Sequence, residues 1–131
     1  MFLDASVIIA IIARESDASA LFERLRQANE VYTSPVAVFE AVLGLARVGN
    51  ISIQEAGVVL ERFLEEMQAR IISISPAIGR SAIAAFDRFG KGRHRAGLNL
   101  GDCFAYACAR ELNVPILAKG NDFPQTDITI G

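Results

Sequence analysis

Short apolar segments of β type alternate along this chain with longer segments of helical periodicity. The β-type segments are residues 1–3, 31–33, 70–75 and 114–118, with a short alternating segment at 127–130. The helical segments are residues 5–14, 17–28, 35–48, 53–69, 76–89 and 102–112. Strands that are separated by helices usually pair in parallel and need a helical layer on each face. The order therefore predicts a three-layer α/β/α fold with a mainly parallel central sheet of four to five strands.

Local signals support two of the helix starts. Ser34 precedes Pro35, which is the usual pairing of an N-cap residue with proline at the first helical position. Ser52 is followed three residues later by Glu55, which predicts a capping box at the next helix. On the helix after Pro35 we expect Val36, Phe39, Leu43 and Ala46 to point inward, with Glu40 at the edge of that stripe.

The length and the composition fit one domain spanning residues 1–131. More than half of the residues are hydrophobic (52%), as a buried core requires. The apolar run at 7–13 is far shorter than the ~20 residues of a membrane span, so we expect a buried helix and a cytoplasmic protein. Cys103 and Cys108 are five residues apart on one predicted helix and should not bond to each other.

Four acidic residues stand near the ends of these elements: Asp4, Glu40, Asp102 and Asp122. Asp4 follows the first β-type segment, and Asp122 lies a few residues after the one at 114–118. The functional crevice of a parallel sheet lies beyond the carboxyl ends of its strands, so these acids can meet there. Clustered carboxylates repel one another unless a hard divalent cation holds them together. The placement therefore predicts magnesium chemistry on a phosphodiester.

Each acid also has a simpler explanation. Asp4 and Asp102 are placed to cap helices, and the dipole of its helix would also keep Asp102 ionised. Glu40 either turns out into solvent or has a partner inside, because an unpaired buried charge is costly. Asp122 and Asp127 flank Phe-Pro and suit a turn. The joint placement of the acids, rather than any single one, favours a site, with the hydroxyl of residue 6 beside the first of them.

A glycine-rich basic stretch leads into Asp102. Lys91, Arg93, His94 and Arg95 lie there, and they suit either a solvated loop or contacts with phosphate groups of RNA. The net charge of −2 does not exclude a nucleic-acid substrate. Without the four clustered acids, 13 basic residues stand against 15 − 4 = 11 acidic ones. A cation in the cluster would therefore leave a mildly cationic surface.

These motifs together resemble PIN-domain ribonuclease toxins of the VapC family. The resemblance covers essentially the whole chain. It rests on Asp4-Ala-Ser6, on Glu40, on Gly101-Asp102-Cys-Phe-Ala-Tyr-Ala and on Lys119-Gly-Asn-Asp122-Phe. It implies that Asp4 and Asp102 are the main ligands of Mg²⁺ or Mn²⁺, and that Glu40 and Asp122 complete the catalytic pocket. It also implies supporting roles for Ser6 and Asp127.

The resemblance further implies the toxin of a type II toxin–antitoxin pair, acting as a metal-dependent endoribonuclease. Its expected partners are an RNA substrate, a VapB-type antitoxin and a second copy in a homodimer, with DNA reached only through the antitoxin and no membrane. The number of metal ions and the acid that accepts the proton stay open. An alternative is a catalytically silent PIN scaffold that mainly binds the antitoxin. A phospho-accepting signalling domain is disfavoured, because the segment 70–75 has no aspartate to phosphorylate.

Overall fold

The computed structural model describes all residues, 1–131, and has a central sheet of four parallel strands in the order β3-β2-β1-β4. The strands are β1 (Phe2–Leu3), β2 (Tyr32–Thr33), β3 (Arg70–Ile71) and β4 (Ile116–Leu117). The helices are α1 (Ala5–Ile12), α2 (Ala18–Arg26), α3 (Pro35–Gly49), α4 (Ile53–Glu66), α5 (Pro76–Phe89) and α6 (Leu100–Leu112). A 3₁₀ turn, η1, spans Phe123–Gln125. The predicted three-layer α/β/α fold is confirmed.

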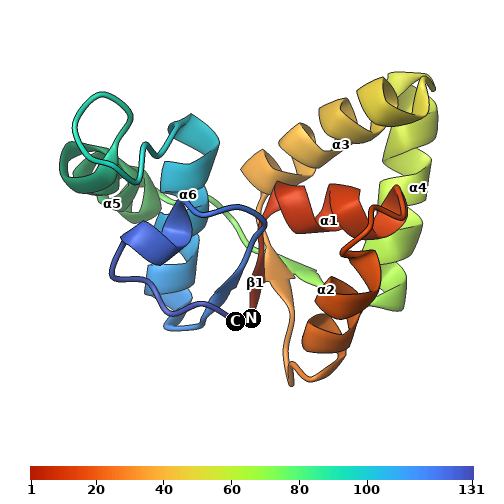
Figure 1. Ribbon diagram of the computed structural model, residues 1–131, viewed down its shortest axis with the longest axis horizontal. Helices are drawn as coiled ribbons and strands as arrows, with labels where there is room; N and C mark the ends of the chain where they lie inside the picture. Colours follow the sequence, from red (N-terminus) through yellow and green to blue (C-terminus); the bar gives the residue numbers. More distant parts are fainter.

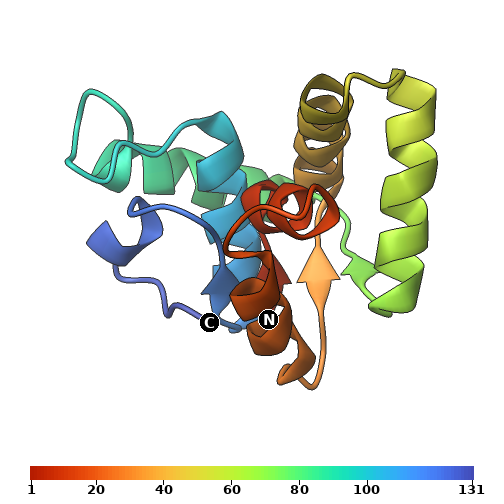
Figure 2. The same ribbon diagram turned by 45° about the vertical axis from the view of Figure 1, so that its right-hand side comes forward.

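The strands are shorter than the sequence predicts. Phe2 is in register with Tyr32 on one side and with Ile116 on the other. The expected strand at 70–75 pairs only over Arg70–Ile71, and the expected strand at 127–130 is reduced to a single bridge between Ile116 and Ile130. The strand arrows point the same way, away from the two chain termini, so all carboxyl ends share one edge (Figure 2). That edge is where the acids were expected.

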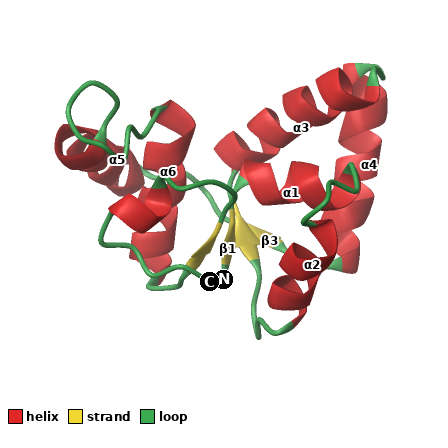
Figure 3. Cartoon of the chain, in the orientation of Figure 1, coloured by secondary structure: helices red, strands yellow, loops and turns green.

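Two hydrophobic cores lie on opposite faces of the sheet (Figure 3). Phe2 and Ile116 point toward α5 and α6, whereas the adjacent Leu3 and Leu117 point toward the layer formed by α1 to α4. Neighbouring strand residues face opposite sides, so even two-residue strands contribute to both cores. All four side chains are fully buried, and each stabilises the fold by about 1.5–3 kcal/mol.

Capping explains where several helices begin. Ser34 caps α3 through the backbone N–H of Ala37, and Ser52 and Glu55 form the predicted capping box of α4. The start predicted for α6 was two residues late, because Asn99, and not a residue at 101 or 102, is its N-cap. Cys103 and Cys108 are buried free thiols, as expected.

The predicted inward stripe of α3 was right for Ala46, which is buried, but wrong for its two largest residues. Phe39 is 64% exposed and Leu43 is 45% exposed, whereas the buried positions are mainly small residues such as Ala41 and Gly44. Gly44 lies directly against the side chain of Ile9 on α1, where an added Cβ would overlap it. Close approach of α1 and α3 therefore selects the small face of α3 and turns the larger side chains outward.

No single helix is both long and apolar enough to cross a membrane. Only α3 and α4 taken together, across a bend of 118°, reach that length and composition.

Candidate active site

Asp4 lies at the carboxyl end of β1 and caps α1. Its backbone N–H donates to the carbonyl of Leu117 at 3.0 Å, which aligns the ends of β1 and β4. Both the N–H and the hydroxyl of Ser6 donate to Oδ2 of Asp4, at 3.0 and 2.5 Å. The Ser6 hydroxyl in turn accepts the backbone N–H of Lys119 at 3.0 Å. Asp4 is only 8% exposed. The same carboxylate therefore caps α1 and lies buried at the carboxyl edge of the sheet.

Glu40 projects from α3 across to the first turn of α6. Its carboxylate fills the space beside Gly101, where a Cβ built on the glycine would lie 2.5 Å from the Glu40 carboxyl carbon and closer still to both oxygens. No group of the chain donates a hydrogen bond to Glu40, although the side chain is half-buried. Glu40 therefore borders the cluster as a carboxylate without a donor.

Asp102 occupies the third position of α6 and forms a capping box with Asn99. The Asn99 N–H donates to Oδ2 of Asp102 at 3.0 Å, and the Asp102 N–H donates to Oδ1 of Asn99 at 2.9 Å. This arrangement fixes one carboxylate oxygen of Asp102 and leaves the other without a donor in the chain. Asp122 is exposed and immediately precedes η1, and its side chain makes no capping bond.

The four acids interact electrostatically. Burial, and then the charge of Asp122, raise the pKa of Asp4 against the opposing bonds from Ser6. Burial, and then the charges of Asp4 and Asp102, raise the pKa of Glu40 to about 6. Burial also raises the pKa of Asp102 to about 6 against the opposing hydrogen bond from Asn99, and the charges of Asp4 and Asp122 add smaller increases. The structure thus brings Glu40 and Asp122 each within electrostatic range of Asp4 and Asp102.

This group of oxygen donors suits a hard divalent cation. Carboxylates are the preferred ligands of Mg²⁺ and Mn²⁺, and Glu40, Asp102 and Asp122 have oxygens that no donor in the chain satisfies. No three acidic, histidine or cysteine side chains already surround a single ion-sized position. The residues fit a cation by their chemistry, and the carboxylates would have to turn inward to enclose it.

Asp127 has other partners. It accepts a hydrogen bond of 2.5 Å from the buried Tyr106 hydroxyl and pairs with Arg88 at 3.2 Å. The bond from Tyr106, followed by that from Arg88, lowers the pKa of Asp127, and none of the four acids affects it. The structure therefore assigns Asp127 to a contact that ties the C-terminal segment to α5 and α6, outside the acidic cluster.

The basic stretch forms a loop before α6, at the same end of that helix as Asp102 (Figure 1). Lys91 and Arg95 are exposed and have no acidic partner. Arg93 pairs with Asp87 at 2.8 Å. His94 is half-buried, stands edge-to-face on Phe89 with ring centroids 5.1 Å apart, and accepts a hydrogen bond from the Ala96 N–H at 3.0 Å. His94 therefore folds the loop, and Lys91 and Arg95 are the free cations.

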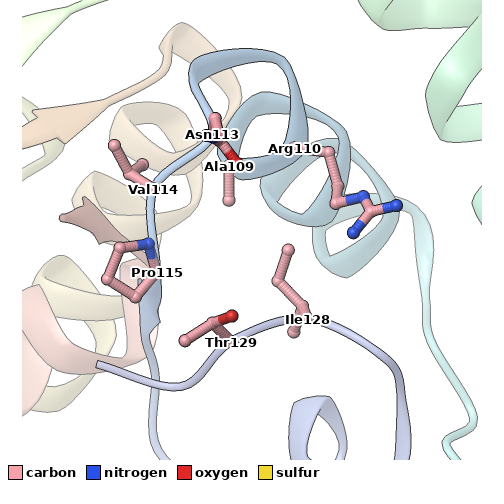
Figure 4. A pocket seen from close by; sticks show the side chains of 7 residues that line it. All are labelled: Ala109, Arg110, Asn113, Val114, Pro115, Ile128 and Thr129. Atoms are coloured by element: carbon pink, nitrogen blue, oxygen red, sulfur yellow. The ribbon is translucent and has the colours of Figure 1, made fainter.

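A hollow of about 420 Å³ lies at the C-terminal end of α6 (Figure 4). The C-terminal end of α6, the start of β4 and the C-terminal segment form it, and no acidic side chain lines it. The eleven residues from Asp102 to Asn113 place it about 16 Å along α6 from the cluster. The hollow is not part of the acidic site.

Three contributors to the site were missed in the sequence. Asn99 could have been found, because Asn99-x-x-Asp102 has the spacing of a capping box. The backbone N–H of Lys119 and the space at Gly101 had no such signal, because both depend on elements far apart in sequence.

Comparison with known proteins defines the family. The PIN domain family model matches residues 1–128. The VapC ribonuclease of Rhizobium meliloti is 40% identical, over 97% of this chain and 98% of its own. The chain belongs to the VapC family of PIN-domain ribonucleases. Ribonuclease VapC36 of Mycobacterium tuberculosis is 38% identical, over 98% of this chain and 91% of its own.

Two solved structures share the fold. Mycobacterium tuberculosis VapC20, described as a Sarcin-Ricin loop cleaving toxin, matches with a TM-score of 0.76 at 18% identity, over 98% of this chain and 95% of its own. A chain of a toxin–antitoxin complex from Klebsiella pneumoniae matches with a TM-score of 0.71 at 17% identity, over 99% of this chain and 95% of its own. At these identities the structures support the fold alone.

Proposed function

We propose that this VapC protein is the toxin of a type II toxin–antitoxin pair and hydrolyses RNA phosphodiester bonds in a reaction that depends on Mg²⁺ or Mn²⁺. The observation that carries the proposal is the convergence of Asp4, Glu40, Asp102 and Asp122 at the carboxyl edge of the sheet. Burial there, followed by the charges of neighbouring acids, raises the pKa of Asp4, Glu40 and Asp102, and no basic side chain compensates these charges. The family membership of the chain supports the same activity.

The chain's own residues prepare the site. Asp4 and Asp102 are the proposed principal metal ligands, because backbone and side-chain donors orient both carboxylates. Glu40 from α3 and Asp122 from the segment before η1 complete the acidic cluster. Ser6 holds the Asp4 carboxylate in place. A bound divalent cation would activate water and stabilise charge on the phosphate oxygens.

The loop before α6 is the proposed RNA contact. Lys91 and Arg95 present free positive charges at the end of α6 that carries Asp102, so they can neutralise phosphates that flank the scissile bond. Arg93 and His94 are held by contacts within the protein and are expected to contribute less, contrary to the equal weight that the sequence suggested. RNA as substrate also favours a cytoplasmic site of action.

Two protein partners complete the proposal. A VapB-type antitoxin is the expected inhibitor, supported by family membership and by the structural likeness to a chain of a toxin–antitoxin complex. A second copy of the chain is the expected partner of an apolar groove of about 620 Å³ between α5 and α6. Ile83 (72% exposed) and Leu100 (69% exposed) border this groove, and their burial would stabilise a homodimer.

The decisive test is RNA cleavage by the purified protein and its Asp4→Asn variant. Asparagine keeps an N-cap acceptor for α1 but removes the charge, so we expect a folded protein with cleavage lowered by at least about a thousandfold. EDTA should abolish wild-type cleavage, and Mg²⁺ or Mn²⁺ should restore it. Glu61→Gln, which neutralises an exposed acid on α4, is the control and should leave cleavage unchanged.

Unchanged cleavage by Asp4→Asn, or by protein treated with EDTA, contradicts the proposal. A wild-type protein that binds its antitoxin but cleaves no RNA would favour the catalytically silent scaffold instead.

A further inference from the structure

We propose that Gly101 is a positioning residue for the active site, because its missing side chain makes the space in which the Glu40 carboxylate lies beside Asp102. The inference rests on the proposed function and extends it to a residue that carries no functional group. The juxtaposition joins α3 to the first turn of α6, and fifty residues of sequence separate these two helices.

The space at Gly101 is already filled by Glu40. A Cβ at this position would lie 2.5 Å from the Glu40 carboxyl carbon and nearer to its two oxygens, which is closer than non-bonded atoms approach. Gly101 is itself buried, so the carboxylate packs directly on the helix backbone. The next residue along α6 is Asp102, whose charge raises the pKa of Glu40. A shift of the Glu40 carboxylate away from Gly101 therefore also changes its position relative to the Asp102 carboxylate.

The backbone itself does not require glycine at position 101. The glycines with positive φ are Gly92, Gly97 and Gly120, and Gly101 lies within regular helix. Glycine is a poorer helix former than alanine, so its presence there weakens the helix locally. The conformation thus offers no reason for glycine, whereas the space for Glu40 does.

The other helical glycines differ from Gly101. A Cβ at Gly57 or Gly79 would meet no atom within 4 Å, and at Gly44 it would meet the apolar side chain of Ile9. Gly101 is the position where a carboxylate occupies the place of the side chain. Gly57 on α4 therefore provides a matched control for a glycine-to-alanine change in a helix.

The test compares Gly101→Ala, Gly57→Ala, Glu40→Asp and the double variant Glu40→Asp/Gly101→Ala in three measurements. Thermal unfolding reports on the fold, calorimetric titration with Mn²⁺ reports on the cation site, and cleavage of RNA reports on activity. The added Cβ meets only the far end of the Glu40 side chain, which can rotate away, so Gly101→Ala should keep the wild-type melting temperature or raise it. We expect its Mn²⁺ affinity to fall about tenfold and its cleavage about ten- to a hundredfold. Gly57→Ala should leave the Mn²⁺ affinity and the RNA cleavage unchanged.

The double variant separates positioning from a general structural role. Aspartate is one methylene shorter, so it should lower Mn²⁺ affinity when glycine is at 101 but raise it when alanine is there. Simple addition of the two single effects would overturn the inference. So would wild-type Mn²⁺ affinity in Gly101→Ala, or a folding defect in Gly101→Ala that Glu40→Asp does not repair. A wild-type protein that neither binds Mn²⁺ nor cleaves RNA overturns the proposed function and this inference with it.

Discussion

Replacing Asp102 by asparagine should make the metal-free protein more stable and at the same time remove its response to metal. Asp102 is half-buried among like charges, and burial is the main reason that its pKa rises to about 6. Asparagine is uncharged but keeps an oxygen that can accept the Asn99 N–H, so the capping box of α6 survives. The substitution therefore isolates the effect of the charge.

The magnitude follows from the pKa. A carboxyl whose pKa moves from 3.8 to about 6 is destabilised in its charged form by about 3 kcal/mol. Solvent screens a half-buried group, so about 1 kcal/mol is a reasonable expectation at neutral pH. Loss of the favourable interaction of an acid with the N-terminus of α6 subtracts about 0.3–0.5 kcal/mol. The net gain of about 0.5–0.7 kcal/mol corresponds to a melting temperature about 2–3 °C higher.

The assay is thermal and urea-induced unfolding in EDTA and in excess Mg²⁺ at pH 7.5. Binding of Mg²⁺ at a hundred times its Kd should stabilise the wild type by about 2.7 kcal/mol and the variant hardly at all. Glu55→Gln is the matched control, because Glu55 has the same place in the capping box of α4 but no acidic cluster around it. We expect Glu55→Gln to lower the free energy of unfolding slightly, whereas Asp102→Asn should raise it.

The pH dependence gives a second check. Because the folded-state pKa of Asp102 is raised, its protonated form favours the fold, and this stability is lost as the pH rises from about 4 through about 6. The advantage of Asp102→Asn should therefore be absent below pH 4 and complete above about pH 6. A variant that is less stable than the wild type at pH 7.5 in EDTA would refute the reasoning, as would one that Mg²⁺ stabilises as strongly.

Three further outcomes are expected. Ser6→Ala removes the hydroxyl that donates to Asp4 and accepts from the end of β4, so the free energy of unfolding should fall by about 1–2 kcal/mol and RNA cleavage should fall too. Unchanged urea unfolding would contradict this. Lys91→Ala should weaken RNA binding and reduce the slope of log affinity against log salt by about 0.7, while Arg93→Ala, whose ion pair already neutralises it, should change the slope less. Equal slopes in a binding titration would contradict the assigned loop contact. Ile83→Asp should halve the mass measured by sedimentation if the apolar groove is the dimer interface, and a wild type that is already monomeric would disprove the homodimer.

Local patterns predicted most of the elements because their causes are local. The alternation of β-type and helical segments predicted a parallel sheet between two helical layers, and the capping residues Ser34 and Ser52 predicted the starts of α3 and α4. The placement of Asp4 after β1 followed from chain direction in a parallel sheet. These features depend on a few neighbouring residues and on general rules of topology.

Packing between distant elements decided what the sequence left open or indicated wrongly. The apolar pattern of α3 favoured Phe39 and Leu43 as inward residues, but close approach to α1 buries its small face instead. The sequence placed Asp127 in a turn near the site. Hydrogen bonds from Tyr106 and Arg88 instead hold its carboxylate outside the acidic cluster. In each case a contact with another element, and not the local pattern, decides where the side chain lies.

The sequence alone therefore determined the fold class and the identity of the four acids. Only the tertiary structure showed that burial and neighbouring acids raise the pKa of Glu40 and Asp102, that Asn99 and Ser6 orient two of the acids, and that Gly101 leaves the space for Glu40. The physical reason is the distance along the chain between the residues that interact. Strand direction and helix capping arise from neighbouring residues, whereas burial, carboxylate repulsion and steric space depend on atoms that folding brings together from segments far apart in the chain.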